Sequence, residues 1–215
     1  MTKIVFFGDS VTDAVRPRDI DAYLGSGYAT IAAAALSCRY PMQYTFLNRG
    51  IGGNRVVDLY ARIKSDLINL EPAYVSILVG VNDVWHELEH RNGVAADKFE
   101  TVYGMLTEEI RAALPGVKLL ILEPFVVRGS ATDNTEEQPQ RYAQFRREVE
   151  LRAAAARRVA AACGGVFVPL QERFDRRCAE YENSNSFWVR DGVHPTAAGH
   201  GLIADAWVEA FETIR

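Results

Sequence analysis

Tyr74-Val75-Ser76-Ile77-Leu78-Val79 is an almost unbroken apolar run, and Gly80-Val81-Asn82-Asp83 follows it directly. A short run of Val, Ile and Leu is typical of a β-strand that is covered on both faces, as in a parallel sheet. Glu71-Pro72 interrupts the chain just before the run, and Gly80 permits a turn just after it. We therefore expect a buried strand over Tyr74–Val79.

Similar short apolar runs alternate with longer amphipathic stretches along the chain. The other predicted strands are Lys3–Phe7, Tyr44–Asn48, Val117–Leu122 and Val166–Val168. Helices are predicted over Tyr28–Cys38, Val56–Leu70, Phe99–Leu114, Gln140–Cys163, Leu170–Tyr181 and Ala197–Ile214. Loops are predicted over Trp85–Lys98 and Glu123–Pro139.

Five strands that alternate with helices indicate the α/β class with a parallel sheet. Right-handed crossovers then give a three-layer α/β/α sandwich around a five-stranded, doubly wound, flavodoxin-like sheet. The length of 215 residues, without an internal repeat or an interdomain linker, predicts a single domain over residues 1–215. Ligands of such sheets bind outside the carboxyl ends of the strands, so the residues that follow each strand are the candidates for function.

The composition, with 48% hydrophobic and 24% charged residues, suits a soluble globular protein. A net charge of −4 without a Lys/Arg cluster argues against a nucleic-acid or anionic-membrane partner. No apolar run approaches the ~20 residues of a membrane span, and no signal-peptide pattern is present. Cys38, Cys163 and Cys178 lack metal-type spacing, so we expect reduced thiols, a cytoplasmic location, no metal and no cofactor. The Ala-rich segment Arg152–Ala162 could pack internally or against a partner subunit, which leaves a homo-oligomer open.

Two of the predicted strands are followed by residues that could carry chemistry. Gly8-Asp9-Ser10 follows the first strand, and Ser10 could be a helix cap or a nucleophile on the strand-to-helix turn. The glycines of Asn48–Asn54 follow the second strand and could make a plain turn or present backbone N–H groups to an anion. A nucleotide-phosphate loop has little support there, because no Gly-Lys-Ser/Thr follows.

Asn82, Asp191 and His194 complete the set of candidates. Asn82 could cap a turn or direct its amide at a developing negative oxygen. In Asp191-Gly192-Val193-His194-Pro195, the carboxylate can reach back to the imidazole and fix its tautomer, although His194 could also merely cap the last helix. Together these residues supply a hydroxyl, an oriented base and oxyanion donors, which is the set that acyl transfer needs.

The same residues resemble the motif blocks of a known family. Gly8-Asp9-Ser10, Gly53, Gly80-x-Asn82-Asp83 and Asp191-x-x-His194 match, in order, the four blocks of the SGNH (GDSL) hydrolases. This resemblance implies Ser10 as nucleophile, His194 as base and Asp191 as the residue that orients it. It also implies an oxyanion hole made by the backbone N–H groups of Ser10 and Gly53 and by the Asn82 side chain. Gly52 departs from the pattern, since many members carry Ser there.

The stretches Phe7–Asp13, Gly80–Trp85 and Val193–His200 look most like the bacterial carbohydrate acetylesterases of that family, acetylxylan esterases included. The resemblance implies a small-molecule ester substrate, with a short acyl group, chiefly acetyl, on a sugar such as an acetylated xylo-oligosaccharide. Trp85 and Trp188 lie close in sequence to Asn82 and Asp191, and aromatic faces suit sugar rings. Both tryptophans could therefore wall the cleft, or they could equally well pack loops.

Three alternatives remain at this stage. A thioesterase or lysophospholipase of the same family would use the same residues on another ester. His86-Glu87-Leu88-Glu89-His90 fits the His-Glu-x-x-His pattern of zinc hydrolases, although Arg91-Asn92-Gly93 ends it at once. A non-catalytic binding module would leave Ser10 and Asn82 unexplained. His200 is expected to pack on the last helix rather than to act.

Overall fold

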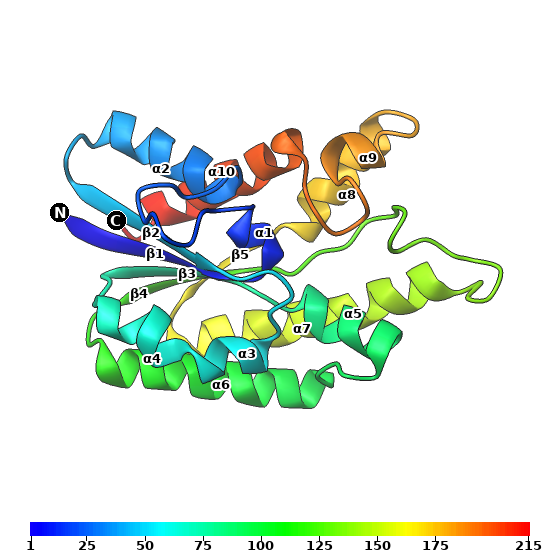
Figure 1. Ribbon diagram of the computed structural model, residues 1–215, viewed down its shortest axis with the longest axis horizontal. Coiled ribbons are helices and arrows are strands. Elements are labelled where there is room, and N and C mark those ends of the chain that lie inside the picture. The colour runs from blue at the N-terminus through cyan, green and yellow to red at the C-terminus, as the bar shows by residue number, and fades with distance from the viewer.

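The computed structural model describes residues 1–215 and contains five parallel strands in the order β2-β1-β3-β4-β5 (Figure 1). This is the strand order of a flavodoxin-like, doubly wound sheet, and the predicted fold class is confirmed. The strands are β1 (Thr2–Gly8), β2 (Tyr44–Gly50), β3 (Tyr74–Leu78), β4 (Lys118–Leu122) and β5 (Val166–Val168). Each predicted strand therefore forms, with ends that differ by at most two residues.

Helices cover both faces of this sheet. One layer contains α2 (Tyr28–Arg39) and α10 (Ala197–Glu212), and the opposite layer is built around α6 (Ala96–Ala113) and α7 (Arg141–Cys163) (Figure 1). The remaining elements are α1 (Ser10–Asp13), α3 (Val56–Ala61), α4 (Ile63–Asp66), the 3₁₀ helix η1 (Ile68–Leu70), α5 (Val81–His90), α8 (Gln171–Glu180) and α9 (Asn185–Trp188).

Strand β1 shows why the sheet is apolar on both sides. Ile4 and Phe6 belong to the core beneath α2 and α10, where the Phe6 ring lies 5.1 Å from that of Trp207. Val5 and Phe7 belong to the core on the other face. Because side chains alternate between the faces of a strand, a strand covered on both faces must be apolar at every position.

Two sequence predictions about helices are wrong. The continuous helix expected over Val56–Leu70 is divided into α3, α4 and η1, because the backbone leaves helical geometry at Arg62 and Leu67. The loop expected over Trp85–Lys98 is largely helical, since α5 runs through to His90 and α6 begins at Ala96. The loop expected after β4 is present: residues 123–140 contain no helix or strand.

The carboxyl ends of β1, β2 and β3 meet at one edge of the sheet. Gly8 is opposite Gly50 on one side and Leu78 on the other. The chain leaves β1 for β2 at one edge and then returns past β1 to β3, so the topological switch point lies here. The segments that carry Ser10, Gly53 and Asn82 consequently emerge side by side.

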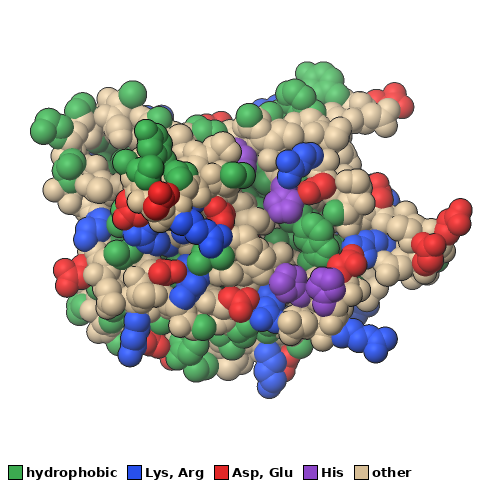
Figure 2. All heavy atoms as spheres, viewed as in Figure 1, with side chains coloured by type: hydrophobic (Ala, Val, Ile, Leu, Met, Phe, Trp, Pro, Cys, Tyr) green, Lys and Arg blue, Asp and Glu red, His purple; other side chains and the backbone are tan.

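Acidic and basic side chains are interspersed on the face drawn in Figure 2, without a large patch of one sign. None of the helices combines the length and the apolar character that crossing a bilayer requires.

Candidate active site

Ser10 is the first residue of α1, directly after the end of β1. Asp9 caps this short helix, since its carboxylate accepts a hydrogen bond of 2.9 Å from the Val11 N–H. Gly8 is required at the turn, because a Cβ there would lie 2.4 Å from the Leu78 carbonyl oxygen. The Ser10 N–H, at the start of the helix, has no intrahelical acceptor.

Three side chains form a continuous hydrogen-bonded chain at this end of the sheet. The distance between Ser10 Oγ and His194 Nε2 is 2.9 Å. The distance between His194 Nδ1 and Asp191 Oδ2 is 2.7 Å. A hydroxyl, an imidazole and a carboxylate in this order can move a proton from the hydroxyl to the ring nitrogen that faces it, Nε2.

The Asp191 carboxylate is held in its ionised form. Burial alone would raise the pKa of Asp191, but hydrogen bonds from the His194 ring and from the His194 and Val193 backbone outweigh that effect. The two backbone N–H groups donate to Oδ1 at 2.8 and 3.0 Å. The net result is a pKa well below the ordinary value, so the carboxylate stays negative beside the imidazole.

The loop that carries Asp191 and His194 is fixed at both ends and from the side. Val189 and Pro195 form an antiparallel bridge, and the Arg190 N–H donates to the His194 carbonyl. From the side, the Ala131 N–H donates to the Asp191 carbonyl over 2.9 Å. The long loop after β4 thus supports the orientation of the carboxylate.

The loop that contains Gly53 lies beside Ser10, since a Cβ on Gly52 would be 3.8 Å from the Ser10 Cβ. Gly53 has φ of +80°, which disfavours other residues, although nothing lies within 4 Å of a Cβ there. Asn82 is 5% exposed, and its Nδ2 donates to the Asn54 carbonyl over 3.1 Å. Because an amide nitrogen has two hydrogens, the second stays available to an oxyanion.

Two fully buried carboxylates lie behind the candidate oxyanion donors. Asp83 accepts hydrogen bonds from the Val56 N–H at 3.1 and 3.3 Å, and this fixes the start of α3 just after the Gly53 loop. Asp9 Oδ2 has no partner. Burial raises the pKa of each of these carboxyls to about 7.

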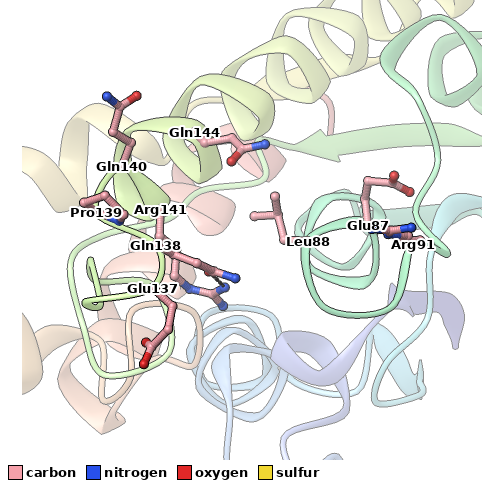
Figure 3. A pocket seen from close by; sticks show the side chains of 9 residues that line it. All are labelled: Glu87, Leu88, Arg91, Glu137, Gln138, Pro139, Gln140, Arg141 and Gln144. Atoms are coloured by element: carbon pink, nitrogen blue, oxygen red, sulfur yellow. Dashed lines mark hydrogen bonds between the residues drawn. The ribbon is translucent and has the colours of Figure 1, made fainter.

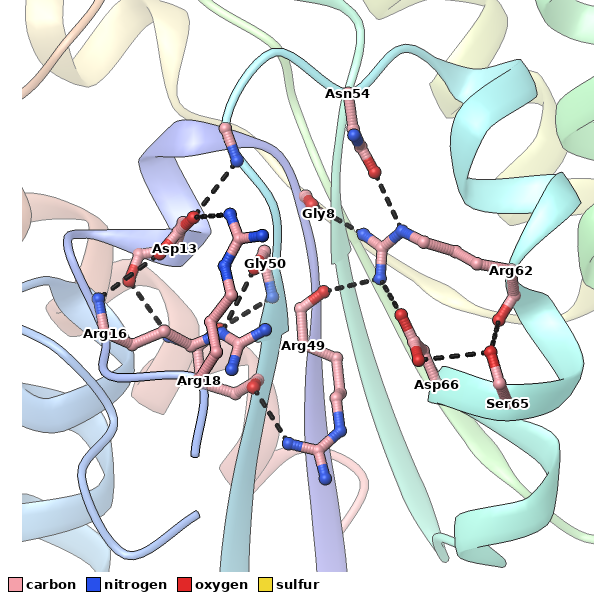
Figure 4. Close-up of polar contacts among 12 residues, drawn as sticks. Gly8, Asp13, Arg16, Arg18, Arg49, Gly50, Asn54, Arg62, Ser65 and Asp66 are labelled. Carbon is pink, nitrogen blue, oxygen red and sulfur yellow. Dashed lines mark hydrogen bonds and ion pairs between the residues drawn. The ribbon is translucent and has the colours of Figure 1, made fainter. Parts of the chain in front are cut away.

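Arg62 is a structural residue of the site that the sequence analysis missed. Its guanidinium donates to the Gly8 carbonyl at 3.0 Å, to the Arg49 carbonyl at 2.8 Å and to Asn54 Oδ1 at 2.8 Å (Figure 4). It also pairs with Asp66 and lies 4.3 Å from the centre of the Phe7 ring. One side chain therefore joins the ends of β1 and β2 to the loop that contains Gly53.

A cleft of about 460 Å³ opens at Ser10 and His194. Its other walls are mostly small side chains, among them Val11, Ala14, Val15, Pro195 and Ala197. His200 also reaches it but is 8% exposed, and its Nδ1 accepts the Tyr28 N–H. Burial and the neighbouring His194 lower the pKa of His200 to about 4, so this ring is a neutral packing group.

The two candidate tryptophans have different surroundings. The Trp85 ring lies 5.9 Å from the His194 ring and 6.2 Å from the Phe145 ring. Trp188 packs against Phe187 at 4.9 Å and beneath Arg177. Neither tryptophan is among the residues that line the cleft at Ser10, and Trp85 lines a neighbouring cavity instead.

His86 and His90 share one face of α5, with ring centres 6.1 Å apart. The helical arrangement that the zinc alternative needs is therefore present. No group of three or more His, Cys, Asp or Glu side chains is placed to hold a metal ion, however, so the pair lacks a third ligand.

Comparison with known proteins identifies relatives along nearly the whole chain. The profile of the GDSL-like lipase/acylhydrolase family matches residues 6–202. An acetylxylan esterase from Geobacillus stearothermophilus is 30% identical over 99% of this chain and 96% of its own length.

Solved structures agree with that result. A Parabacteroides merdae protein described as a GDSL-like lipase superposes with a TM-score of 0.89 at 31% identity, over 98% of this chain and 95% of its own. The Geobacillus acetylxylan esterase superposes with a TM-score of 0.82 at 29% identity, over 97% of this chain and 93% of its own. Variants of that esterase described as catalytic mutants replace a serine, an aspartate and a histidine by alanine.

The buried carboxyl of Asp83 predicts a pH-dependent stability. Its pKa is about 7 in the folded protein and 3.8 in the unfolded chain, so the folded state binds more protons between these values. The free energy of unfolding should fall as the pH rises through this window. The Asp83→Asn side chain can still accept the Val56 N–H. In this variant the decrease in the free energy of unfolding between pH 5 and pH 8, measured by urea denaturation, should be smaller than in the parent by about 2 kcal/mol. The exposed Asp205→Asn is the control, and an unchanged pH profile in Asp83→Asn would contradict the assignment.

Proposed function

Because the chain belongs to the GDSL-like lipase/acylhydrolase family and is a carboxylic ester hydrolase, we propose that it is a serine esterase that removes acetyl groups from carbohydrate esters. The substrates we propose are acetylated xylo-oligosaccharides, which the Geobacillus relative is described as hydrolysing. The observation that carries the proposal is the chain from Asp191 through His194 to Ser10, with contacts of 2.7 and 2.9 Å.

In the proposed first half-reaction, His194 Nε2 takes the Ser10 proton while Oγ attacks the ester carbonyl. The negative oxygen that forms is held by the Ser10 and Gly53 N–H groups and by the Asn82 amide. His194 then gives its proton to the sugar oxygen, which leaves as an alcohol, and the acetyl group remains on Ser10. Asp191 stays ionised throughout and stabilises the imidazolium.

In the second half-reaction, a water molecule replaces the sugar alcohol. His194 takes a proton from the water as its oxygen attacks the acetyl carbonyl, and it returns that proton to Ser10 Oγ as the bond breaks. Acetate is released and the serine is restored. No metal or cofactor is needed for any of these steps.

The walls of the cleft favour a short acyl group. Val11, Ala14 and Ala197 offer limited apolar surface next to Ser10, and Asp13 and Arg190 place charge in the same cleft. A long acyl chain would gain little apolar contact there and would desolvate those charges. This supports an acetylesterase over the thioesterase or lysophospholipase alternative.

The proposal describes residues 1–215 as one hydrolase domain that acts in the cytoplasm. Its three cysteines are free, which suits a reducing compartment. Its small-molecule substrate would enter the cleft directly, and the reaction itself requires neither a nucleic acid nor a membrane.

Removal of the nucleophile is the direct test. Ser10→Ala should lower kcat for p-nitrophenyl acetate by about 10⁴–10⁶-fold while the protein remains folded, because the covalent route is lost. A fluorophosphonate should form one adduct, located by mass spectrometry on Ser10 and absent from the variant. The exposed Ser37→Ala on α2 should behave as the parent does. Equal hydrolysis by Ser10→Ala and the parent would refute the assignment, and loss of activity on adding a chelator would favour a metal enzyme.

The Asn82 amide should act chiefly on the transition state. Loss of one oxyanion donor typically costs about 10²–10³ in turnover, so Asn82→Ala should lower kcat and kcat/KM by that factor with little change in KM. Steady-state kinetics with p-nitrophenyl acetate measures this split. Asn69→Ala, at an exposed position in η1, is the matched control. A variant that raises KM while kcat stays at the parent value would assign Asn82 to ground-state binding instead.

The acyl preference separates the esterase candidates. Release of acetate from acetylated xylo-oligosaccharides should be more efficient, in kcat/KM, than hydrolysis of p-nitrophenyl esters of eight carbons or more. The small walls of the cleft are the physical reason. Faster hydrolysis of the long-chain esters would exclude the carbohydrate assignment and favour the lipid or thioester alternative.

A further inference from the structure

A groove lies beside α5, close to the His194 imidazole. Its inner cavity, of about 340 Å³, is bounded by Trp85, whose ring lies 5.9 Å from that of His194. Its outer cavity, of about 560 Å³, shares Glu137, Gln138 and Arg141 with the inner one and ends at Gln144 (Figure 3). The two cavities adjoin along these shared residues, between α5 and the start of α7, and together we call them the α5 groove.

The α5 groove is polar almost throughout. Of the nine residues that line its outer cavity, one is hydrophobic, namely Leu88. The others offer carboxylates, side-chain amides and guanidinium groups, in the residues Glu87, Arg91, Glu137, Gln138, Gln140, Arg141 and Gln144, with Pro139. An acyl chain would desolvate these groups without replacing their hydrogen bonds, whereas a ligand rich in hydroxyl groups could pair with them.

Arg141 holds the walls of the groove in place. Its side chain is 8% exposed, and its guanidinium donates to Gln138 Oε1 at 2.7 Å and to the Ala131 carbonyl at 2.9 Å. It also forms an ion pair with Glu89 of α5, on the opposite wall. A buried cation that bridges the helix and the loop keeps the groove open before a ligand arrives, which lowers the cost of ordering on binding.

The position of the leaving group indicates which end of the groove lies nearest the scissile ester. His194 Nε2 must protonate the oxygen of the departing alcohol, so a leaving sugar lies next to the imidazole. Trp85 flanks that imidazole, is partly exposed, and lines the inner cavity. A sugar chain that continues past the imidazole on this side meets first an aromatic side chain and then the amides and carboxylates.

We propose that the α5 groove binds the distal sugar residues of an oligosaccharide leaving group, with Trp85 contacting the unit nearest the scissile ester and Gln138 and Gln144 hydrogen-bonding units farther out. This inference rests on the proposed carbohydrate esterase function and adds to it a selection for chain length. Longer leaving groups make contacts with the groove through their distal units, and a monosaccharide lacks these units and their binding energy.

A substrate series that differs only in length tests the groove. Singly acetylated xylose, xylobiose, xylotriose and xylohexaose are compared through kcat/KM, with p-nitrophenyl acetate as the ester too small to reach the groove. In the parent, kcat/KM should rise by about 10-fold or more from xylose to the longer chains and then level off. Gln138→Ala and Gln144→Ala should each lower the ratio of the xylohexaose to the xylose value by about 3- to 10-fold, mainly through KM.

Matched variants keep the result interpretable. Because Trp85 contacts the unit that acetylxylose also has, Trp85→Ala should lower kcat/KM for every sugar acetate relative to p-nitrophenyl acetate and leave the length ratio in place. Trp85 also packs on Phe145, so the exposed Gln144→Ala tests the groove where the tryptophan variant does not fold. Gln43→Ala, exposed at the start of β2, should keep the ratio of the parent. A parent ratio near one, or an undiminished ratio in both glutamine variants, would overturn the groove assignment. Failure of the proposed function is distinguishable, because none of the acetylated sugars, acetylxylose included, would then release acetate efficiently, whereas failure of the groove alone leaves all of them hydrolysed at similar kcat/KM.

Discussion

The contact between Ser10 Oγ and His194 Nε2 joins residues that are 184 positions apart in the chain, and the rest of the site depends on it. Ser10 is fixed by the end of a central strand, whereas His194 lies on a loop just before the last helix. The position of α10 on the sheet therefore determines the distance between Ser10 Oγ and His194 Nε2. Its Trp207 ring lies 5.1 Å from that of Phe6 on β1 and 5.0 Å from that of Phe211, and His200 accepts the Tyr28 N–H. Apolar packing of α10 against β1 and α2 thus positions the proposed catalytic contact at its far end.

The oxyanion side is built from polar contacts instead. Arg62 donates to two strand-end carbonyls and to Asn54, Asp83 accepts the Val56 N–H, and Asn82 donates to the Asn54 carbonyl. A loop with few apolar side chains has no core of its own, so buried hydrogen bonds must hold it. The cost of this arrangement is visible in Asp9 and Asp83, since burial makes both carboxylates unfavourable as ions.

The strands and candidate residues could be predicted from the sequence because each depends on local pattern. Buried parallel strands need continuous apolar runs, and the residues that follow them are placed by topology alone. Helix α5 was also detectable, since Val81, Val84, Trp85 and Leu88 have helical spacing that the polar residues between them obscured. The role of Arg62 was not detectable: its acceptors include main-chain carbonyls of distant strands, which have no residue-type signature. The break at Arg62, which divides the expected Val56–Leu70 helix, also leaves the apolar spacing of that segment unchanged, so the spacing gave no sign of it.

Helix α5 links the chemistry to the choice of substrate. Its first turn contains Asn82 and Asp83, which hold the proposed oxyanion loop, and its following turns present Trp85, Leu88 and Glu89 to the α5 groove. A helix is stiff over this length, so a displacement at one end moves the other. Arg141 pairs with Glu89 and also binds the Ala131 carbonyl, while the Ala131 N–H supports Asp191. The groove wall and the carboxylate that orients the base are therefore parts of one hydrogen-bonded unit. Substitutions in this wall that shift Ala131 should alter turnover as well as binding, whereas those confined to the exposed Gln144 should alter binding alone.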